Sequence, residues 1–212
     1  MANSKKIIHH ENHQEAITRD KTVFGFWVYL MTDLLMFAVL FATYAVLHGN
    51  IFNGPSGKEM FDLPFALTET LILLTSSFTA GLAILAVRRH GMASALGVRQ
   101  NNKNQVLLWL GITFLLGLSF LGLEISEFSK LVKEGNSWQR SAFLSSYFTL
   151  VATHGLHITV GLFWMAICMI KVKSQGLTVG IGRKLTLLSL FWHFLDIVWI
   201  FIFTIVYLMG AI

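Results

Sequence analysis

Carboxyl and imidazole groups inside long apolar stretches are the side chains of this sequence whose types could do chemistry. Both groups can hold or pass on a proton, and imidazole is also a common metal ligand. If such a stretch crosses a bilayer, a charge at its centre costs about 2.5–3.5 kcal/mol, so these groups normally face protein or water. The candidate buried polar residues, inside or directly after the stretches, are Asp33, Glu69, Glu124, Glu127, His154, His157, His193 and Asp196.

The spacing of two residue pairs predicts which groups share a helix face. His154 and His157 are three residues apart, as are His193 and Asp196, which is close to one helical turn. A His–Asp contact between the last two apolar stretches is therefore geometrically possible. Because no Lys or Arg lies inside the apolar stretches, we expect the acids to be protonated, bonded to histidine or hydrated.

Three roles are open to these groups. The first is a polar clamp between helices, in which an average hydrogen bond contributes about 0.6 kcal/mol in bacteriorhodopsin. The second is haem or copper ligation, although two of the three histidines lie one turn apart and a bis-histidine haem needs ligands on opposite faces. The third is a carboxyl proton relay, although no continuous chain of acids crosses the apolar stretches. The residues favour the clamp, with no catalytic, cofactor-binding or metal-binding residue in this chain.

Five apolar stretches must position these residues. They run over 24–47, 65–87, 106–125, 142–170 and 185–209, and each supplies the roughly 20 residues that cross about 30 Å of hydrocarbon. Hydrophobic residues make up 55% of the 212 residues and charged residues only 13%, against about 25% in soluble domains. Backbone amides in lipid must bond within their own segment, so the stretches are helical. The sequence predicts an all-α, polytopic membrane protein with a bundle of five transmembrane helices over 24–212.

The distribution of positive charge predicts the orientation of this bundle. Most of the 16 Lys and Arg residues fall in the polar segment 1–23 and in the second and fourth loops, and the side richer in these residues is cytoplasmic. We therefore expect a cytoplasmic N-terminal tail over 1–23 and a C-terminus outside. Lys171 and Lys173, at the cytoplasmic end of the fourth span, are candidates for binding lipid phosphate.

Other features exclude several classes of protein. The single cysteine, Cys168, excludes a disulfide scaffold and a thiolate metal cluster. The net charge of +5 sits between apolar stretches, so it indicates membrane flanks and not a nucleic-acid partner. Six aromatic residues lie toward span ends, as in an aromatic belt: Trp27, Tyr29, Trp109, Trp138, Tyr147 and Tyr207. Five glycines allow close contact between helices: Gly111, Gly117, Gly122, Gly155 and Gly161.

Four segments together resemble subunit III of the haem–copper respiratory oxidases. They are THGLHITVG at 153–161, FWHFLDIVWIFIFTIVYLMG at 191–210, ISEFSKL at 125–131 and FGFWVYLMTDLLMFAVLFATYAVL at 24–47. The last resembles the family's helix with a buried acid in its first half, here Asp33 where many relatives carry Glu. The resemblance covers roughly residues 22–212. Within the family, the chain is most similar to the five-span form of subunit III that occurs in bacterial ubiquinol oxidases of the cytochrome o type.

The resemblance implies an accessory, non-redox subunit of a proton-pumping terminal oxidase, a complex that oxidises ubiquinol and reduces O₂ to water. The haems and copper would belong to subunit I, and this chain would contact subunit I, other oxidase subunits and phospholipid in the bacterial inner membrane. Its role would be to stabilise the complex, hold lipid and support proton uptake in subunit I. The alternatives are subunit III of a cytochrome c oxidase and a stand-alone ion-coupled transporter.

Overall fold

The computed structural model describes residues 2–50, 62–95 and 103–211, and all regular secondary structure in those ranges is helical. Five helices are long and apolar enough to cross a membrane, which confirms the predicted fold class. The candidate spans are Lys21–Leu47, Leu63–Arg89, Lys103–Lys133, Ala142–Gln175 and Val179–Leu208. The predicted orientation of the termini stays a prediction.

The chain divides into two compact units, Met1–Ala38 and Val39–Ile212. Helix α1 (Ala2–Leu47) begins in the first unit and ends in the second, and its backbone is helical through the polar segment that precedes the first span. The second unit also contains α3 (Leu63–Ala95), α4 (Lys103–Lys133), α5 (Ala142–Gln175) and α6 (Val179–Ile202). A π-helix, η1 (Phe203–Leu208), and the short α7 (Met209–Ala211) continue α6 to the end of the described chain.

The helices extend beyond the apolar stretches that predicted them. Helix α4 continues to Lys133, whereas the apolar stretch ends at residue 125, and α6 begins at Val179, six residues before its stretch. Apolar composition marks only the part of a helix that lies in hydrocarbon, while backbone hydrogen bonding continues into the polar ends. As a result Glu127 lies within α4, one turn after Glu124, and not beyond the helix.

Side-chain caps set where three helices begin. Ser141 Oγ accepts a hydrogen bond from the Leu144 amide at 3.1 Å, and Thr178 Oγ1 accepts one from the Ile181 amide at 3.3 Å. Asp62 accepts from the Phe65 amide at 3.4 Å before α3. These oxygens satisfy amides that have no partner in the first helical turn.

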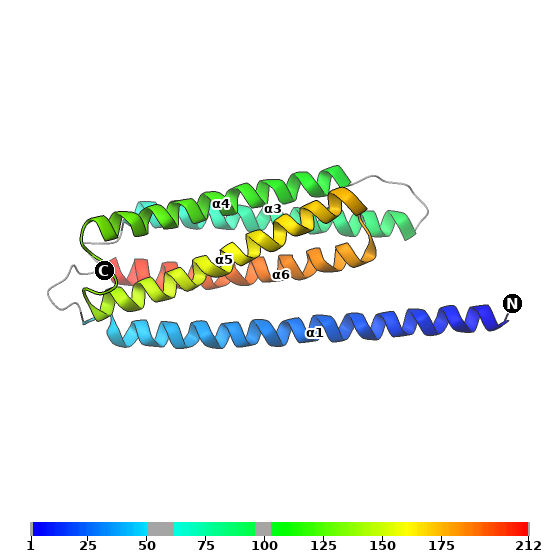
Figure 1. Ribbon diagram of the computed structural model, residues 1–212, viewed down its shortest axis with the longest axis horizontal. Coiled ribbons are helices and arrows are strands. Elements are labelled where there is room, and N and C mark those ends of the chain that lie inside the picture. Colours follow the sequence, from blue (N-terminus) through cyan, green and yellow to red (C-terminus); the bar gives the residue numbers. More distant parts are fainter. Residues whose placement is uncertain (1, 51–61, 96–102, 212) are drawn as a thin grey trace. The chain divides into compact units, whose positions relative to one another are not determined.

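Helices α3, α4, α5 and α6 form a closed ring in which α3 contacts α4 and α6, and α5 contacts the same two. Figure 1 shows these four helices running along the same axis. Antiparallel succession places the end of α4 and the start of α5 at one end of the ring. The Lys103 ammonium donates to the Lys173 carbonyl at 2.6 Å, which joins the start of α4 to the end of α5 at the other.

Two buried tryptophans fill the centre of the ring. A Cβ at Gly117 of α4 would lie 2.9 Å from the Trp192 indole, and a Cβ at Gly161 of α5 would lie 3.0 Å from it. The Trp192 Nε1–H also donates to Ser76 Oγ at 3.1 Å. The same kind of bond joins Trp199 Nε1–H to a threonine hydroxyl of α3 at 3.1 Å. These glycines therefore act as predicted, by making room for a large side chain.

Two of the five glycines do not have the predicted role in this chain. A Cβ at Gly111 or Gly122 of α4 would meet nothing within 4 Å among the described residues. Helix spacing alone does not distinguish a glycine that faces a neighbouring helix from one on the outer surface.

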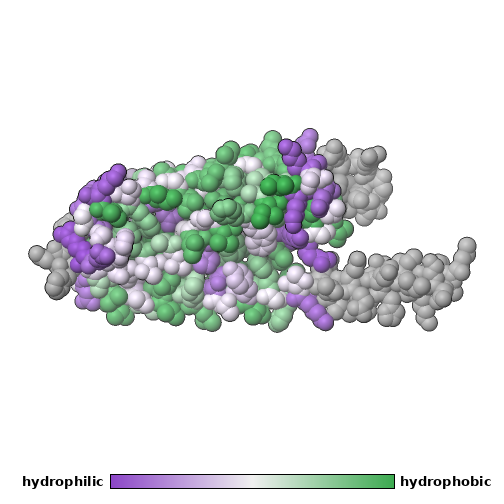
Figure 2. Space-filling model, in the orientation of Figure 1, coloured by the Kyte–Doolittle hydropathy of each residue, from purple (hydrophilic) through white to green (hydrophobic). Residues whose placement is uncertain are grey.

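The outer surface has the polarity of a membrane protein. In Figure 2, the coloured residues are hydrophilic mainly near the helix ends and mostly hydrophobic or intermediate between them. Large apolar side chains such as Phe78, Leu115 and Phe163 are exposed on this surface. Exposed apolar surface of this kind is favourable only in contact with lipid or another apolar protein surface.

Candidate functional site

Three glutamates and two tyrosines gather toward the end of the ring where α4 ends and α5 begins; we call them the glutamate–tyrosine cluster. They are Glu69 of α3, Glu124 and Glu127 of α4, Tyr147 of α5 and Tyr207 of η1. Glu69 is fully buried, Glu124 is 2% exposed, and both tyrosines are fully buried. The three carboxyl groups lie close enough to interact electrostatically. The structure thus brings together three acids that the sequence placed on two separate spans.

Hydrogen bonds connect only part of this cluster. The Tyr207 hydroxyl donates to Glu127 Oε2 at 2.9 Å, and the Tyr147 and Tyr207 hydroxyl oxygens lie 2.9 Å apart. In the described chain, all four carboxyl oxygens of Glu69 and Glu124 are buried without a hydrogen-bond partner. Glu127 therefore has donors available to stabilise a carboxylate, whereas the other two acids have none.

The tyrosines of the cluster do not form part of an aromatic belt, so the prediction for Tyr147 and Tyr207 was wrong. Their rings pack inside the bundle with centroids 6.2 Å apart, and Tyr207 also packs on Trp199 at 6.2 Å. Proximity to a span end suits both an interface tyrosine and a buried one. Glu127 decides between the two positions here, because it is an acid at the same end of the bundle and accepts a hydrogen bond from a buried tyrosine hydroxyl.

Gly155 of α5 creates the space that Glu124 occupies. A Cβ at this position would lie 2.7 Å from Glu124 Oε1 and 2.9 Å from Oε2, closer than real Cβ contacts allow. The carboxyl group therefore rests directly against the backbone of α5. The predicted close approach at Gly155 is confirmed, and what approaches it is a carboxyl group.

His154 lies in the aromatic interior and is fully buried. Its Nε2 lies 3.2 Å from the Leu195 carbonyl oxygen, to which it donates, and its ring packs on Trp199 at 5.2 Å and on Phe120 at 5.8 Å. The polar clamp between α5 and α6 is therefore present. Its acceptor is a backbone carbonyl, because Leu195 and not Asp196 faces the imidazole.

The other candidates on α5 and α6 lie apart from this contact. His157 Nδ1 lies 2.7 Å from the carbonyl of Thr153 on its own helix, and His157 is half-buried. His193 is exposed on the surface of α6. Asp196 is 7% exposed, and its Oδ1 has no hydrogen-bond partner in the part of the chain that the structure describes.

Asp33 belongs to the first unit and is described there alone. It follows Tyr29 by one helical turn, and its carboxyl group interacts with the Tyr29 hydroxyl. The acid that carries the sequence resemblance in the first span thus has a partner on its own helix.

The two lipid-phosphate candidates lie at the end of α5 with other cations. Lys173 is exposed and Lys171 is half-buried. Lys103, whose ammonium group caps the Lys173 carbonyl, adds a third positive charge from the start of α4. The described cations at this end come from four helices, because Arg89 ends the span of α3 and Lys184 lies near the start of α6. Lys58 of the first loop and Arg99 of the second lie outside the described residues.

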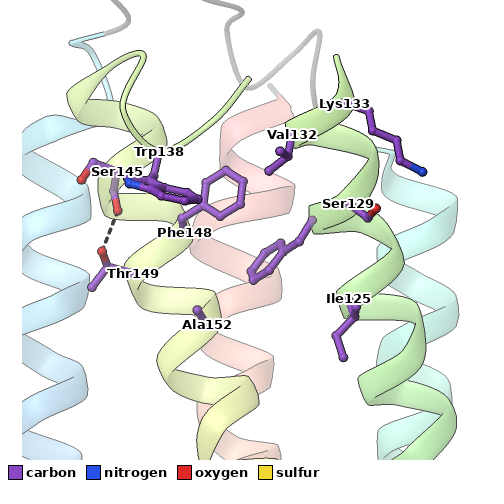
Figure 3. A pocket seen from close by; sticks show the side chains of 10 residues that line it. Ile125, Ser129, Val132, Lys133, Trp138, Ser145, Phe148, Thr149 and Ala152 are labelled. Carbon is purple, nitrogen blue, oxygen red and sulfur yellow. Dashed lines mark hydrogen bonds between the residues drawn. The ribbon is translucent and has the colours of Figure 1, made fainter. Parts of the chain in front are cut away.

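A groove of about 730 Å³ opens between the end of α4 and the start of α5. Figure 3 shows Ile125 and Val132 on one side, Phe148 and Ala152 on the other, and Trp138 near the loop between them. Lys133 is its charged side chain and lies at the end of α4. The sequence did not predict this groove, because its lining comes from two helices and a loop that only the tertiary structure brings together.

The described residues do not assemble a metal site. Among them, no three His, Cys, Asp or Glu side chains are grouped so that they could hold a metal ion. The buried histidines instead make backbone and aromatic contacts. What the interior can do chemically is retain or exchange protons at its carboxyl groups and hold its helices together.

Comparison with known proteins gives the family of this chain. The profile of the family described as cytochrome c oxidase subunit III matches residues 4–211. A Pseudomonas aeruginosa protein named cytochrome bo(3) ubiquinol oxidase subunit 3 is 50% identical over all of this chain and 96% of its own length. A Bacillus subtilis quinol oxidase subunit 3 is 43% identical, and a cytochrome c oxidase subunit 3 of Bacillus sp. strain PS3 is 44% identical; each match covers 89% of this chain and 87% of the relative. This polytopic membrane chain therefore belongs to the cytochrome c oxidase subunit III family, whose members are subunits of multi-subunit terminal oxidases.

Proposed function

We propose that this chain is the accessory, non-redox subunit III of a proton-pumping terminal ubiquinol oxidase in the bacterial inner membrane. The observation that carries the proposal is the full-length similarity to a ubiquinol oxidase subunit 3 at 50% identity. In this reading subunit I is the main partner and carries the haems and copper, and the complex oxidises ubiquinol and reduces O₂ to water. A bundle filled by packed tryptophan, phenylalanine and tyrosine side chains suits a subunit that supports a neighbour.

The composition of the purified complex tests this proposal. Gentle extraction with an affinity tag on this chain should co-purify a large subunit with a haem absorption spectrum. The isolated chain should have no haem band and should transport no ions in vesicles. Stoichiometric haem or copper on the isolated chain would overturn the non-redox assignment, and ion transport by the chain alone would favour a transporter.

The alternative is subunit III of a cytochrome c oxidase, favoured by the 44% identity to the Bacillus sp. PS3 relative. The electron donor separates the two. The purified complex should consume O₂ with ubiquinol as donor and not with reduced cytochrome c. If the complex instead used reduced cytochrome c and not ubiquinol, the chain would be subunit III of a cytochrome c oxidase. Its family and its accessory role would be unchanged.

We further propose that the chain holds phospholipid and supports proton uptake in subunit I. The cations Lys171, Lys173 and Lys103 at one end of the ring support phosphate binding there. The apolar groove beside Lys133 has the dimensions and lining for an acyl chain. Lipid held in this way would fill the surface between the subunits and keep water out of it.

Lipid analysis of the purified complex tests the phosphate contact. Lys171→Gln combined with Lys173→Gln should reduce the anionic phospholipid retained per complex, as measured by mass spectrometry. Lys184→Gln, which removes an exposed cation from the start of α6, is the matched control. Equal retention in the double variant and the control would show that the two lysines only set topology.

A further inference from the structure

The glutamate–tyrosine cluster contains three carboxyl groups, and its surroundings do not have enough donors and cations to stabilise all three as carboxylates. Glu69 is fully buried and Glu124 is 2% exposed, and the two interact with Glu127 across α3 and α4. No hydrogen-bond donor of the described chain reaches the carboxyl oxygens of Glu69 or Glu124. A buried carboxylate without a cation or donor is so unfavourable that the group binds a proton instead. Adjacent carboxylates add repulsion in the same direction.

Glu127 has a different environment from the other two acids. It accepts a hydrogen bond from Tyr207 at 2.9 Å and interacts with the Tyr147 hydroxyl. Burial disfavours its carboxylate, as does the negative charge of Asp62, whereas the positive charge of Lys130, one turn further along α4, favours it. Hydrogen bonds to a charged carboxylate are about twice as strong as those between neutral groups. The cluster therefore has one position suited to an anion and two that are not.

The remaining titratable groups around the cluster do not alter this division. His154 of α5 donates its Nε2–H to the Leu195 carbonyl, and its Nδ1 has no described partner. Asp196 of α6 has no described bond to any of the three acids. Neither group brings a positive charge to Glu69 or Glu124.

We propose that Glu69 and Glu124 form a proton-binding site that holds two protons at neutral pH, with Glu127 as its single carboxylate. Because Gly155 has no side chain, the Glu124 carboxyl group fits between α4 and α5, where it is shielded from water. Glu127 lies six residues before the end of α4, about 9 Å along the helix axis at 1.5 Å per residue. It is thus nearer the end of α4 than Glu124 is. This site does not depend on which electron donor the complex uses.

Infrared spectroscopy of the intact oxidase complex tests the proposal directly. The complex is purified through this chain after growth with glutamate that is isotope-labelled at the side-chain carboxyl carbon, which identifies glutamate bands by their shift. Glu69→Gln and Glu124→Gln should each remove one protonated-carboxyl carbonyl band at neutral pH. Glu127→Gln should remove carboxylate absorption and leave both acid bands. Glu134→Gln, at an exposed acid just after α4, is the control and should leave both acid bands unchanged.

The alternative assignments give different spectra. Loss of carboxylate absorption in Glu69→Gln or Glu124→Gln would mean that the acid is ionised, for example around a bound cation, and would overturn the proposal. If either glutamine variant does not assemble, Gly155→Ala provides a second test, because its methyl group would displace the Glu124 carboxyl. An acid band that shifts in Gly155→Ala supports the site, and an unchanged acid region contradicts it. If no other oxidase subunits co-purified with the wild-type chain, the proposed function would be contradicted, independently of the proton-binding site.

Discussion

At the scale of single residues, the interior is organised by a few close contacts that involve glycine and polar side chains. Gly117 and Gly161 receive the Trp192 indole, and Gly155 receives the Glu124 carboxyl group. In lipid there is little hydrophobic drive between helices, so van der Waals packing and buried hydrogen bonds carry the association. The effects of substitution should therefore depend on what each glycine touches.

Gly117→Ala should destabilise the chain. Its Cβ would lie 2.9 Å from two atoms of the Trp192 ring, which is held by its hydrogen bond to Ser76 and cannot move freely. Overpacking of this kind costs about 1–3 kcal/mol. The change should lower the midpoint of thermal unfolding of the purified complex. Gly111→Ala on the same helix meets nothing within 4 Å and is the control; an equal loss in both variants would contradict the contact.

A double-mutant cycle should reveal the bond between Tyr207 and Glu127. Tyr207→Phe removes the hydroxyl that donates to Glu127 Oε2, and Glu127→Gln weakens the acceptor. Because the two groups are in contact, their stability effects should be non-additive by about 0.5–3 kcal/mol in thermal unfolding. Pairing Tyr207→Phe with Glu134→Gln should give additive effects. Additivity in both cycles would show that the bond contributes nothing.

At the scale of elements, the helices begin at side-chain caps and end beyond their apolar stretches. Helix α5 begins after Ser141, and α6 begins after Thr178, although the apolar stretch of the latter starts only at residue 185. The extension of α4 to Lys133 is what places Glu124 and Glu127 on one face. The ends of these elements therefore matter more for the cluster than their apolar centres.

Removal of the caps should destabilise α5 and α6. Ser141→Ala and Thr178→Ala each remove the oxygen that accepts a first-turn amide, which typically costs about 1 kcal/mol. Thermal unfolding of the complex should show a lower midpoint for both. Ser174→Ala, in the last turn of α5, changes an exposed hydroxyl and should have little effect. A cap variant that unfolds like this control would show that the cap does not stabilise the helix.

At the scale of the whole molecule, antiparallel helices give the ring two chemically different ends. Lys103, Lys171 and Lys173 lie at one end, and the glutamate–tyrosine cluster lies toward the other. The excess of Lys and Arg predicts that the first of these ends is cytoplasmic. If so, the proton-binding site faces the outer side of the membrane.

Thiol labelling in intact cells should determine this orientation. In a Cys168→Ser background, which removes the one native cysteine, Glu134→Cys and Gln175→Cys place single thiols at exposed positions of opposite ends. A membrane-impermeant maleimide should label the residue-134 variant in intact cells and the residue-175 variant only after permeabilisation. The reverse pattern would invert the orientation and with it the side from which the proton-binding site is reached.

The sequence by itself determined the fold class, the number of spans and the family. Twenty-residue apolar stretches leave the backbone no alternative to helices, and the segments around His154 and Trp192 carry the family resemblance. It also identified Glu69, Glu124 and Glu127 as acids at positions where a charge would be unfavourable in a bilayer. Only the tertiary structure decided which groups meet: Leu195 and not Asp196 faces His154, and Tyr207 turns inward to Glu127. Composition records how polar a segment is, but the rotation of each helix depends on side-chain packing between segments far apart in the chain.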